Sequence, residues 1–260
     1  MTPREALLAC GASEAACVAA DVRFLREAGE CGYAAYAVAA FPYYAGAQEG
    51  NLSLYARGID YHRAVRARLR AAAKLLGLAE YREYADASPF REVALAAAAG
   101  LGVVGDNGLL ITKRHGSFVF LGVLCGDMQP DRVSLPAAGC LHCGACSKRC
   151  PGGALGEVFD ETRCLSHITQ TRGALNTAQQ ALLARADTVW GCDICQLCCP
   201  MNKAAEHTDL PEFNSNLLCD LPEDACTLSD RAFRKKYEDR AFVWRGNAPL
   251  RRNFAYKKAY

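Results

Sequence analysis

The stretch Cys140-Leu-His-Cys143-Gly-Ala-Cys146-Ser-Lys-Arg-Cys150-Pro151 decides how this chain is organised. In the spacing Cys-x2-Cys-x2-Cys-x3-Cys-Pro, three neighbouring thiolates hold one [4Fe–4S] cubane, and the fourth, before proline, reaches across to a second cubane. A second group follows at Cys192, Cys195 and Cys199, the last again before a proline, and Cys164 stands between the two groups. These eight thiolates are enough for two complete clusters.

The crossing rule for paired cubanes assigns the ligands of each cluster. Clusters held in this way lie close enough for electron hopping, so the segment is interpreted as an electron-transfer domain. A zinc site with Cys-x2-Cys pairs is the alternative, but the triple run before proline is a poor zinc pattern. Cys198 is a second candidate beside Cys199, which the following proline favours. The predicted ligands are Cys140, Cys143, Cys146 and Cys199 for cluster one, and Cys150, Cys164, Cys192 and Cys195 for cluster two.

The composition is that of a globular protein with a substantial core, since 51% of the 260 residues are hydrophobic. No apolar run reaches the length of about eighteen residues needed to span a bilayer, and charged residues such as Arg4, Glu5 and Glu14 interrupt any leader-like stretch. We therefore expect a cytoplasmic protein without membrane contact. The cytosol keeps thiols reduced, so the fifteen cysteines favour metal ligation over disulfides.

The part of the chain before the cysteine groups mixes strand and helix patterns. Residues 35–41 are typical of a short buried strand, and apolar residues between 61 and 76 recur at near-helical spacing. Ser88-Pro89 is a favoured helix start, and the alanine-rich run to Ala99 stops at Gly100 as a helix would. This part is predicted to be mixed α/β.

Two β-rich segments, 101–112 and 117–124, predict a hairpin over the turn at residues 113–116. A linker is expected at 135–139, after which the cysteine density rises. The predicted fold class is α+β. Its expected domains are a mixed α/β cofactor and substrate domain at 1–134, a bacterial ferredoxin-like domain with two [4Fe–4S] clusters at 135–228, and a basic helical tail at 229–260.

The tail differs in charge from the rest of the chain, because residues 231–260 carry ten Lys and Arg against two acids. Such a surface suits a polyanion, although a solvated helix explains a charge run equally well. Phosphate contacts and base stacking are the predicted roles. The basic candidates are Arg231, Arg234, Lys235, Lys236, Arg251, Arg252, Lys257 and Lys258, and the aromatic ones are Tyr237, Phe242, Trp244 and Phe254.

Several segments resemble, in order, the epoxyqueuosine reductase family, the cobalamin- and iron–sulfur-dependent enzymes of the last step of queuosine biosynthesis in tRNA. The most specific are Ser-Leu-Tyr-Ala-Arg-Gly-Ile-Asp-Tyr-His at 53–62 and Gly-Cys-Asp-Ile-Cys-Gln-Leu at 191–197. Similar segments lie at 99–105, 116–122 and 163–173. Many members of the family continue into a C-terminal helical-repeat domain, so we expect a short form without it.

The resemblance implies cobalamin as a cofactor and a catalytic aspartate at the position of Asp86. Electrons from the clusters would reduce the cobalt, and Asp86 would donate a proton to the departing epoxide oxygen. Such a donor needs a pKa raised by burial against the corrin. Without the resemblance, Asp86 is simply an acid near a helix N-terminus. The implied corrin contacts are Gly105, Asn107, Leu110, Leu121 and Ser166.

The sequence departs from the family at two positions. Asp106 follows Gly105 where the family has a lysine, and Val123 follows Gly122 where a glutamate is common. Contacts to the cofactor or substrate are expected to differ at these places.

Two functions remain open from the sequence. The first is reduction of epoxyqueuosine to queuosine in tRNA, with the anticodon loop as partner, an external electron donor such as flavodoxin or ferredoxin, and a monomeric enzyme. The second is an electron-transfer or corrinoid-reducing module that acts on a protein or a small molecule. The basic tail favours the first, and the absence of the repeat domain favours the second.

Overall fold

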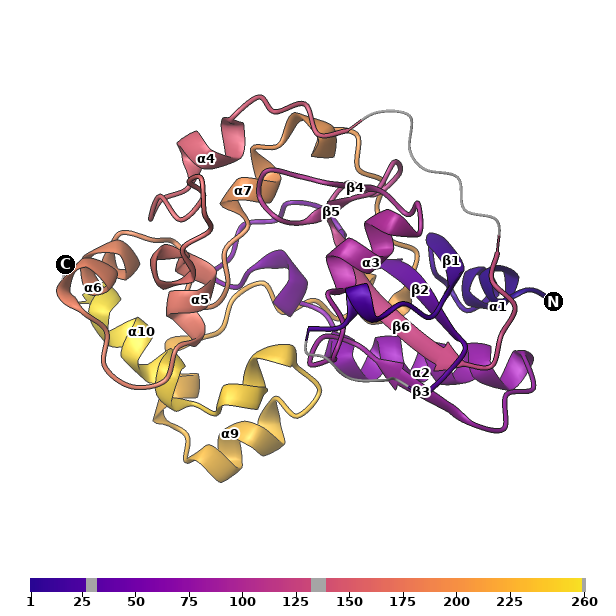
Figure 1. Cartoon of the computed structure of the whole chain (residues 1–260). Coiled ribbons are helices and arrows are strands. Elements are labelled where there is room, and N and C mark those ends of the chain that lie inside the picture. The colour runs from indigo at the N-terminus through magenta and orange to yellow at the C-terminus, as the bar shows by residue number, and fades with distance from the viewer. Residues whose placement is uncertain (27–31, 132–138, 259–260) are drawn as a thin grey trace. The chain divides into compact units, whose positions relative to one another are not determined.

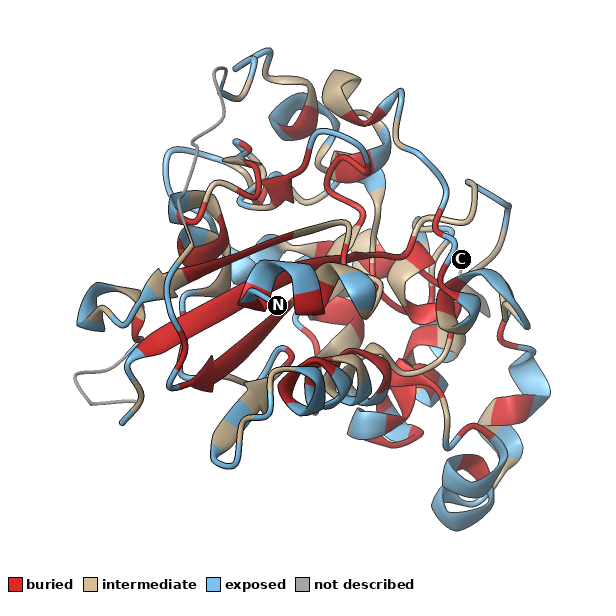
Figure 2. Ribbon diagram, turned by 90° about the vertical axis from the view of Figure 1, so that its right-hand side faces the viewer, coloured by how far each residue is buried: buried red, intermediate tan, exposed pale blue. Residues whose placement is uncertain are grey.

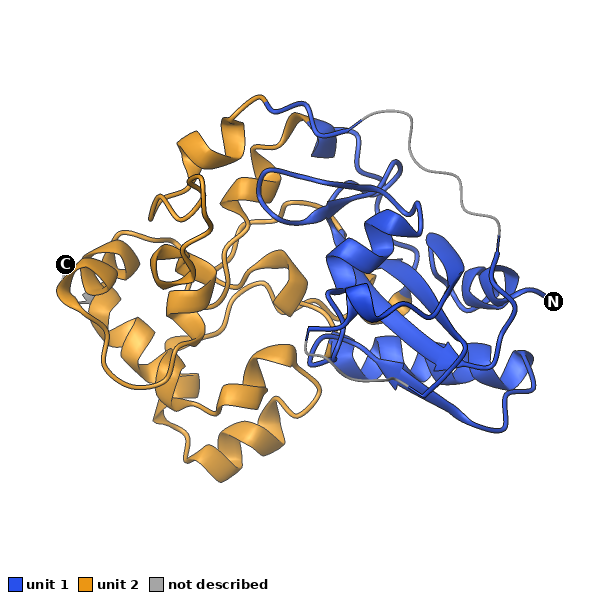
Figure 3. Ribbon diagram, viewed as in Figure 1, with its two compact units in different colours: residues 1–44, 61–142, 201–210 blue, residues 45–60, 143–200, 211–260 orange. Residues whose placement is uncertain are grey.

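Residues 1–26, 32–131 and 139–258 are described by a computed structural model (Figure 1). They form two units, each discontinuous in sequence (Figure 3). Unit 1 comprises residues 1–44, 61–142 and 201–210, and unit 2 comprises 45–60, 143–200 and 211–260. The units therefore differ from the three consecutive ranges expected from the sequence. The expected linker at 135–139 lies outside the described residues, except for Gly139.

A four-stranded antiparallel sheet forms the centre of unit 1. Its strand order is β1-β2-β6-β3, with β1 at Glu14–Ala19, β2 at Ala35–Pro42, β6 at Val119–Gly126 and β3 at Tyr81–Tyr84. The expected strand at 35–41 is thus confirmed. The two central strands are buried almost throughout (Figure 2), because helices cover both faces of the sheet.

The period of two along β2 decides which helix each side chain meets. Tyr36, Val38 and Ala40 share an apolar cluster with helix α3, Glu92–Ala98. On the other face, Gly122 of β6 faces helix α2, Tyr61–Leu75, and a Cβ at this glycine would lie 2.7 Å from Val65 Cγ1. Helix α1, Pro3–Ala9, packs against β1 and α2. The helix predicted between 61 and 76 is therefore confirmed.

Two local predictions for unit 1 are wrong. The segments 101–112 and 117–124 do not pair as one hairpin: β4, Val103–Val104, pairs with β5, Leu110–Ile111, and β6 pairs with β2 and β3. A buried central strand needs a partner on each side, and a hairpin partner alone would leave one edge unpaired. Helix α3 also begins at Glu92 rather than at Ser88-Pro89, since Phe90 forms an antiparallel bridge with Leu25.

Unit 2 consists mainly of short helices. Apolar side chains of its tail, including Phe233, Phe242 and Leu250, form a core with Leu52 and Trp190. The α-helices are α4 at Ala145–Arg149, α5 at Leu165–Gln170, α6 at Thr177–Ala184, α7 at Ile194–Leu197, α8 at Pro211–Asn214, α9 at Asp230–Lys236 and α10 at Ala248–Lys258. Short 3₁₀ turns lie at Leu54–Ala56, Glu161–Arg163, Glu223–Thr227 and Ala241–Arg245.

The tail is helical and basic, as expected, but much of its charge is used inside unit 2. The Arg252 guanidinium donates hydrogen bonds to the carbonyls of Ile168, Thr171 and Gly173, at 2.6 to 3.0 Å. Arg251 donates to Cys226 and Leu228. Both arginines therefore donate to backbone carbonyls of unit 2, and their predicted contacts with phosphates stay a prediction.

The predicted stacking surface is also reduced. Tyr237 and Phe242 are buried in the core of unit 2, and Phe254 packs against it. Trp244 remains 50% exposed, with the Arg245 guanidinium 3.7 Å from its ring centroid. Arg231, Lys235 and Lys236 on α9 are exposed as well. The surface available to a polyanion is therefore α9 with the Trp244–Arg245 pair.

The length of the helices bears on membrane contact. Among residues 1–26, 32–131 and 139–258, no helix is long and apolar enough to cross a membrane.

We predict that Arg252→Met destabilises the protein by about 2–3 kcal/mol, since it leaves several carbonyls at the end of α5 without their charged donor. Lys235→Met, on the exposed face of α9, is the control and should change the free energy of unfolding by less than about 0.5 kcal/mol. Anaerobic urea denaturation measures both. Equal stability of the two variants would show that the Arg252 contacts are not structural.

Candidate functional site

The predicted ligands of cluster two come together within unit 2. The thiols of Cys192 and Cys195 each interact electrostatically with those of Cys150 and Cys164. Helix α4, which ends just before Cys150, packs against α7, which contains Cys195. Thiols separated by more than forty residues in sequence thus converge on one place.

The electrostatics of these thiols suit a metal cluster. Burial, with smaller contributions from the neighbouring thiols, raises the pKa of Cys192 to about 11 and that of Cys195 to about 12. Thiolates so close together are stable only when a cation compensates their charge, and binding of the cation then releases the protons. All fourteen cysteines that the structure describes are free thiols. The donor set therefore fits an iron–sulfur cluster.

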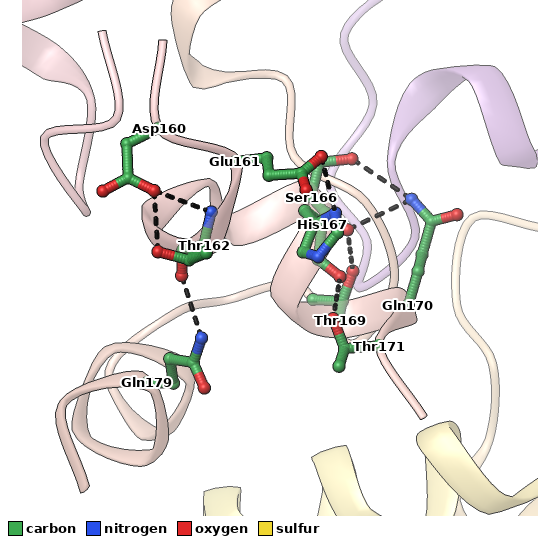
Figure 4. A network of polar contacts seen from close by, with 9 residues as sticks. All are labelled: Asp160, Glu161, Thr162, Ser166, His167, Thr169, Gln170, Thr171 and Gln179. Atoms are coloured by element: carbon green, nitrogen blue, oxygen red, sulfur yellow. Dashed lines mark hydrogen bonds and ion pairs between the residues drawn. The ribbon is translucent and has the colours of Figure 1, made fainter. Parts of the chain in front are cut away.

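The residues on either side of Cys164 form a network of short-range hydrogen bonds (Figure 4). Asp160 caps the turn before it by accepting from the Thr162 amide and hydroxyl. Gln179 of α6 donates to the Thr162 carbonyl at 2.9 Å. Ser166, one of the implied corrin contacts, lies on α5 directly after Cys164, and its carbonyl and hydroxyl accept from Gln170. This network fixes the direction in which the segment presents its thiol.

The second cysteine group is tied to the segment 53–57. The half-buried Asp193 carboxylate accepts hydrogen bonds from the Ser53 hydroxyl and the Leu54 amide, both at 2.8 Å. Gly191 has a φ of 77°, and a Cβ there would lie 2.4 Å from Ser53 Cβ. Burial raises the pKa of Asp193, while the two hydrogen bonds and Arg57 act in the opposite direction. The two most specific segments of the sequence are therefore direct neighbours.

A cavity of about 930 Å³ lies inside unit 2 beside these residues. Its lining includes Ser53, Arg57, Cys192 and Asp193, together with Asp220. The Arg57 guanidinium donates to the carbonyls of Leu52 and Gln48, so it is already engaged. The cavity thus borders the second cysteine group on one side.

The predicted ligands of cluster one are divided between the two units. Cys143, Cys146 and Cys199 lie in unit 2, where Cys198 interacts electrostatically with Cys199 and Cys143. The Cys198 thiol donates to the Cys195 carbonyl. The Cys143, Cys198 and Cys199 thiols are therefore neighbours within unit 2.

Cys140 belongs to unit 1. Its sulfur lies within 4.8 Å of ligand atoms of Asp106 and His142, and the His142 Nδ1 is 2.7 Å from Asp106 Oδ1. Asp106, where the sequence departs from the family, therefore interacts with His142, which lies between Cys140 and Cys143 in the sequence.

Asp86 lies in unit 1 as the acceptor of a small polar cluster. Its Oδ2 accepts from the Tyr61 hydroxyl at 2.8 Å and lies 3.3 Å from His62 Nε2. The His62 ring stacks on Tyr61, and Tyr61 stacks on Phe120 with ring centroids 4.3 Å apart. The Asp86 side chain is 60% exposed. Its carboxylate therefore has hydrogen-bond partners on one side and faces solvent on the other.

The expected rise in the pKa of Asp86 depends on burial against a corrin and stays a prediction. The hydrogen bonds from His62 and Tyr61 outweigh desolvation and hold the pKa of this carboxyl below its ordinary value. Hydrogen bonding to the charged form therefore favours the Asp86 carboxylate over its protonated form. Asp86 also adopts a φ of 57°, which aspartate tolerates better than most residues.

Sequence reasoning did not identify Tyr61 and His62 as partners of Asp86. The signal was the Asp-Tyr-His sequence at 60–62, quoted above only for its resemblance. Helix α3 begins at Glu92, so Asp86 is not the helix N-terminal acid that the alternative interpretation required.

The implied corrin contacts of unit 1 lie around the β4–β5 hairpin. Gly105 and Asn107 form its turn, where the Asn107 side chain accepts from the Leu109 amide. Leu110 is 3% exposed and Leu121 packs partly against the same apolar cluster. Leu110 is therefore part of the apolar core of unit 1, and its contact with a corrin stays a prediction.

Comparison with known proteins first defines the class. Residues 139–202 match the family model of a 4Fe–4S double cluster binding domain. Together with the converging thiols, this match makes the chain an iron–sulfur protein.

The particular family follows from a curated relative. An epoxyqueuosine reductase of Lactococcus garvieae is 36% identical over 217 residues, which cover 80% of this chain and 61% of the relative. The resemblance to the epoxyqueuosine reductase family is therefore confirmed. The chain spans about six-tenths of the length of that relative.

Solved structures agree on the fold. An epoxyqueuosine reductase with an epoxyqueuosine-modified tRNA-Tyr stem loop has a TM-score of 0.83 and is 23% identical, covering 99% of this chain and 80% of that one. An epoxyqueuosine reductase of Bacillus subtilis, described with a catalytic aspartate loop swung out of its active site, has a TM-score of 0.82 at the same identity and coverage. The mixed α/β architecture is thus that of epoxyqueuosine reductases.

We predict that Cys199→Ser removes iron from cluster one, whereas Cys198→Ser retains both clusters, because the Cys198 thiol already has a carbonyl partner. The iron content after anaerobic reconstitution measures the difference, with Cys226→Ser as a control far from both groups in sequence. Equal iron loss in the Cys198 and Cys199 variants would contradict the assignment of Cys199.

Proposed function

We propose that this chain is an iron–sulfur and cobalamin-dependent reductase that converts epoxyqueuosine to queuosine in tRNA. The observation that carries the proposal is the Asp86–His62–Tyr61 cluster, an exposed carboxylate with two donors behind it, in a fold shared with epoxyqueuosine reductases. The homology to those enzymes supports the substrate. The predicted domain roles follow from it, with a cofactor and substrate domain before the cluster domain.

The eight predicted cysteines are proposed to hold two [4Fe–4S] clusters. The convergence of Cys150, Cys164, Cys192 and Cys195, and the double-cluster family match, support this assignment. In this arrangement the clusters accept single electrons from a low-potential external donor, such as a flavodoxin or ferredoxin, and pass them onward.

Cobalamin is proposed as the second cofactor, and features of unit 1 are compatible with it. The β4–β5 hairpin is a tight backbone turn, where a Cβ at Gly105 would meet Asn107 Oδ1 at 2.6 Å, and Val104 beside it is 46% exposed. A closely turned backbone beside an exposed valine is compatible with a flat macrocycle. When bound, a reduced corrinoid supplies the electron pair for opening the epoxide. Gly105, Asn107, Leu110, Leu121 and Ser166 remain the proposed contacts.

The protein's own part in the reaction is to orient and protonate. The stacked rings of Phe120, Tyr61 and His62 hold the Asp86 carboxylate in one direction. His62, when protonated, gives Asp86 an acidic hydrogen bond, so the pair can deliver a proton to the oxygen that leaves the carbon. Asp86 thus acts as the proton-delivering oxygen, and His62 and Tyr61 set its charge.

The proposed partner is the anticodon loop of tRNA. One similar structure contains a tRNA stem loop, and this chain offers the exposed cations of α9 with Trp244 and Arg245. Splayed bases of single-stranded loops stack on such aromatic and guanidinium planes. A tRNA substrate implies a cytoplasmic enzyme, and we propose that it acts as a monomer.

The test is anaerobic reconstitution with iron, sulfide and cobalamin, followed by assay on epoxyqueuosine-containing tRNA with a reduced viologen as electron donor. We expect about eight iron and eight sulfide per chain and conversion to queuosine. Stoichiometric zinc with little iron would overturn the cluster assignment. A fully loaded protein that reduces no epoxyqueuosine would leave the electron-transfer alternative.

We predict that Asp86→Asn retains both cofactors but lowers turnover about a hundred- to ten-thousand-fold, as loss of a general acid does. Asparagine tolerates the φ of 57° as well as aspartate, so the backbone should not change. Single-turnover assays and the cobalamin absorption spectrum separate rate from binding. Near-normal turnover across neutral pH would exclude Asp86 from catalysis.

A further inference from the structure

Unit 1 has a cationic surface of its own, separate in sequence from the basic tail. Of the 15 residues of helix α2, five are Lys or Arg and none is Asp or Glu. The buried residues of this helix are all Ala, Val or Leu, whereas Arg63, Arg70 and Lys74 are exposed. The charge that α2 itself presents to solvent is therefore of one sign.

Four side chains of α2 form a single row. His62, Arg66, Arg70 and Lys74 follow one another at intervals of four, and residues four apart lie on the same face of a helix. We call these four residues the α2 row. At a rise of about 1.5 Å per residue, the row extends about 18 Å along the helix and has one basic side chain per turn.

The α2 row begins at the proposed reactive site. His62 Nε2 lies 3.3 Å from the Asp86 carboxylate, and Arg66 follows one helical turn later, about 5.4 Å along the axis. A nucleotide whose base reaches Asp86 has a phosphate on each side of its sugar. Those phosphates have to be accommodated close to the N-terminal end of α2, where the row starts.

The charges of the α2 row are only partly compensated. Arg70 pairs with Glu83 of β3 at 2.8 Å, and its side chain is still 50% exposed. The Arg66 Nε is buried and has no hydrogen-bond partner among the residues that the structure describes. Like charges four residues apart repel each other and destabilise a helix. A repulsive row with an unsatisfied donor therefore suits a ligand that brings negative charge and hydrogen-bond acceptors.

We propose that the α2 row binds the phosphates that flank the nucleotide entering the Asp86 site. This inference rests on the proposed function, because the nucleic acid is the tRNA substrate proposed above. Guanidinium and ammonium groups form charge-assisted hydrogen bonds to phosphate oxygens, and such contacts position a strand without reading its sequence. Arg66, Arg70 and Lys74 thereby position the nucleotide, and proton transfer stays with Asp86 and His62.

The experiment measures binding of an epoxyqueuosine-containing anticodon stem loop by fluorescence anisotropy. The full chain, reconstituted with both clusters and cobalamin, is titrated between about 50 and 200 mM salt. The double variant Arg66→Gln with Lys74→Gln should bind at least about ten-fold more weakly at 0.1 M salt. Its log–log salt slope should be shallower by about 1.4 to 1.8, because each lost phosphate contact removes about 0.7 to 0.9.

A second double variant controls for net charge. Arg4→Gln with Arg23→Gln removes the same charge from exposed positions of unit 1 on α1 and the turn Val22–Phe24. Its affinity should change by less than about three-fold, since charges away from the strand act only through a field that salt screens. Equal losses in the two double variants would overturn the proposal, because net charge alone would then explain them.

Two single variants exclude misfolding as the cause. Lys74→Glu changes an exposed side chain and should make the slope shallower by at least about 0.7. Glu83→Gln removes the carboxylate that pairs with Arg70 and should bind the stem loop about two-fold tighter or more, a gain that a damaged fold does not produce. Wild-type binding by both single variants would overturn the role of the α2 row.

The outcomes separate this inference from the function on which it rests. If the wild-type protein binds and reduces the stem loop and the α2 variants bind equally well, only the role of the row fails. If the α2 variants lose binding as expected but the wild-type protein reduces no epoxyqueuosine, the proposed reaction fails and the phosphate surface stands. A wild-type protein that shows no salt-sensitive binding would overturn both the tRNA partner and the row.

Discussion

The second cysteine group of unit 2 is joined to the rest of the unit by one half-buried carboxylate. Asp193 accepts from the Ser53 hydroxyl and the Leu54 amide, and this contact joins the loop of the second cysteine group to a segment far earlier in the chain. Because the carboxylate is charged and half-buried, loss of either donor would remove a charge-assisted hydrogen bond and weaken this contact. Gly191 permits the approach, since any side chain there would overlap Ser53. The position of Cys192 and Cys195 follows from this tie.

The proposed reactive site of unit 1 differs from this contact, because its carboxylate, that of Asp86, is largely exposed. The sheet supplies Phe120, whose ring supports Tyr61 and then His62, and these two residues present donors to Asp86. An aromatic stack fixes the donors without enclosing the carboxylate. The pKa of Asp86 then depends on the hydrogen-bond donors around it more than on its burial.

In the basic tail, the density of positive charge in the sequence is higher than the density of positive charge that faces solvent. Arg252 and Arg251 donate to backbone carbonyls, and Asn253 of α10 donates to the carbonyls of Thr169 and Val189. Short helices leave many carbonyls unsatisfied at their ends, and guanidinium groups satisfy several at once. Much of the positive charge therefore stabilises unit 2, and a smaller part, on α9 and beside Trp244, faces solvent.

The sequence by itself determined the features that depend on local spacing: the two cysteine groups of the double-cluster domain, the buried strand at 35–41 and the helix between 61 and 76. Covalent spacing and side-chain period are properties of the chain alone. Only the tertiary structure decided that β6 pairs with β2 and β3, that α3 begins at Glu92, and that Asp86 is a carboxylate held by His62 and Tyr61. Strand partners and pKa values arise from groups that are close in space and distant in sequence, and no local pattern encodes those distances.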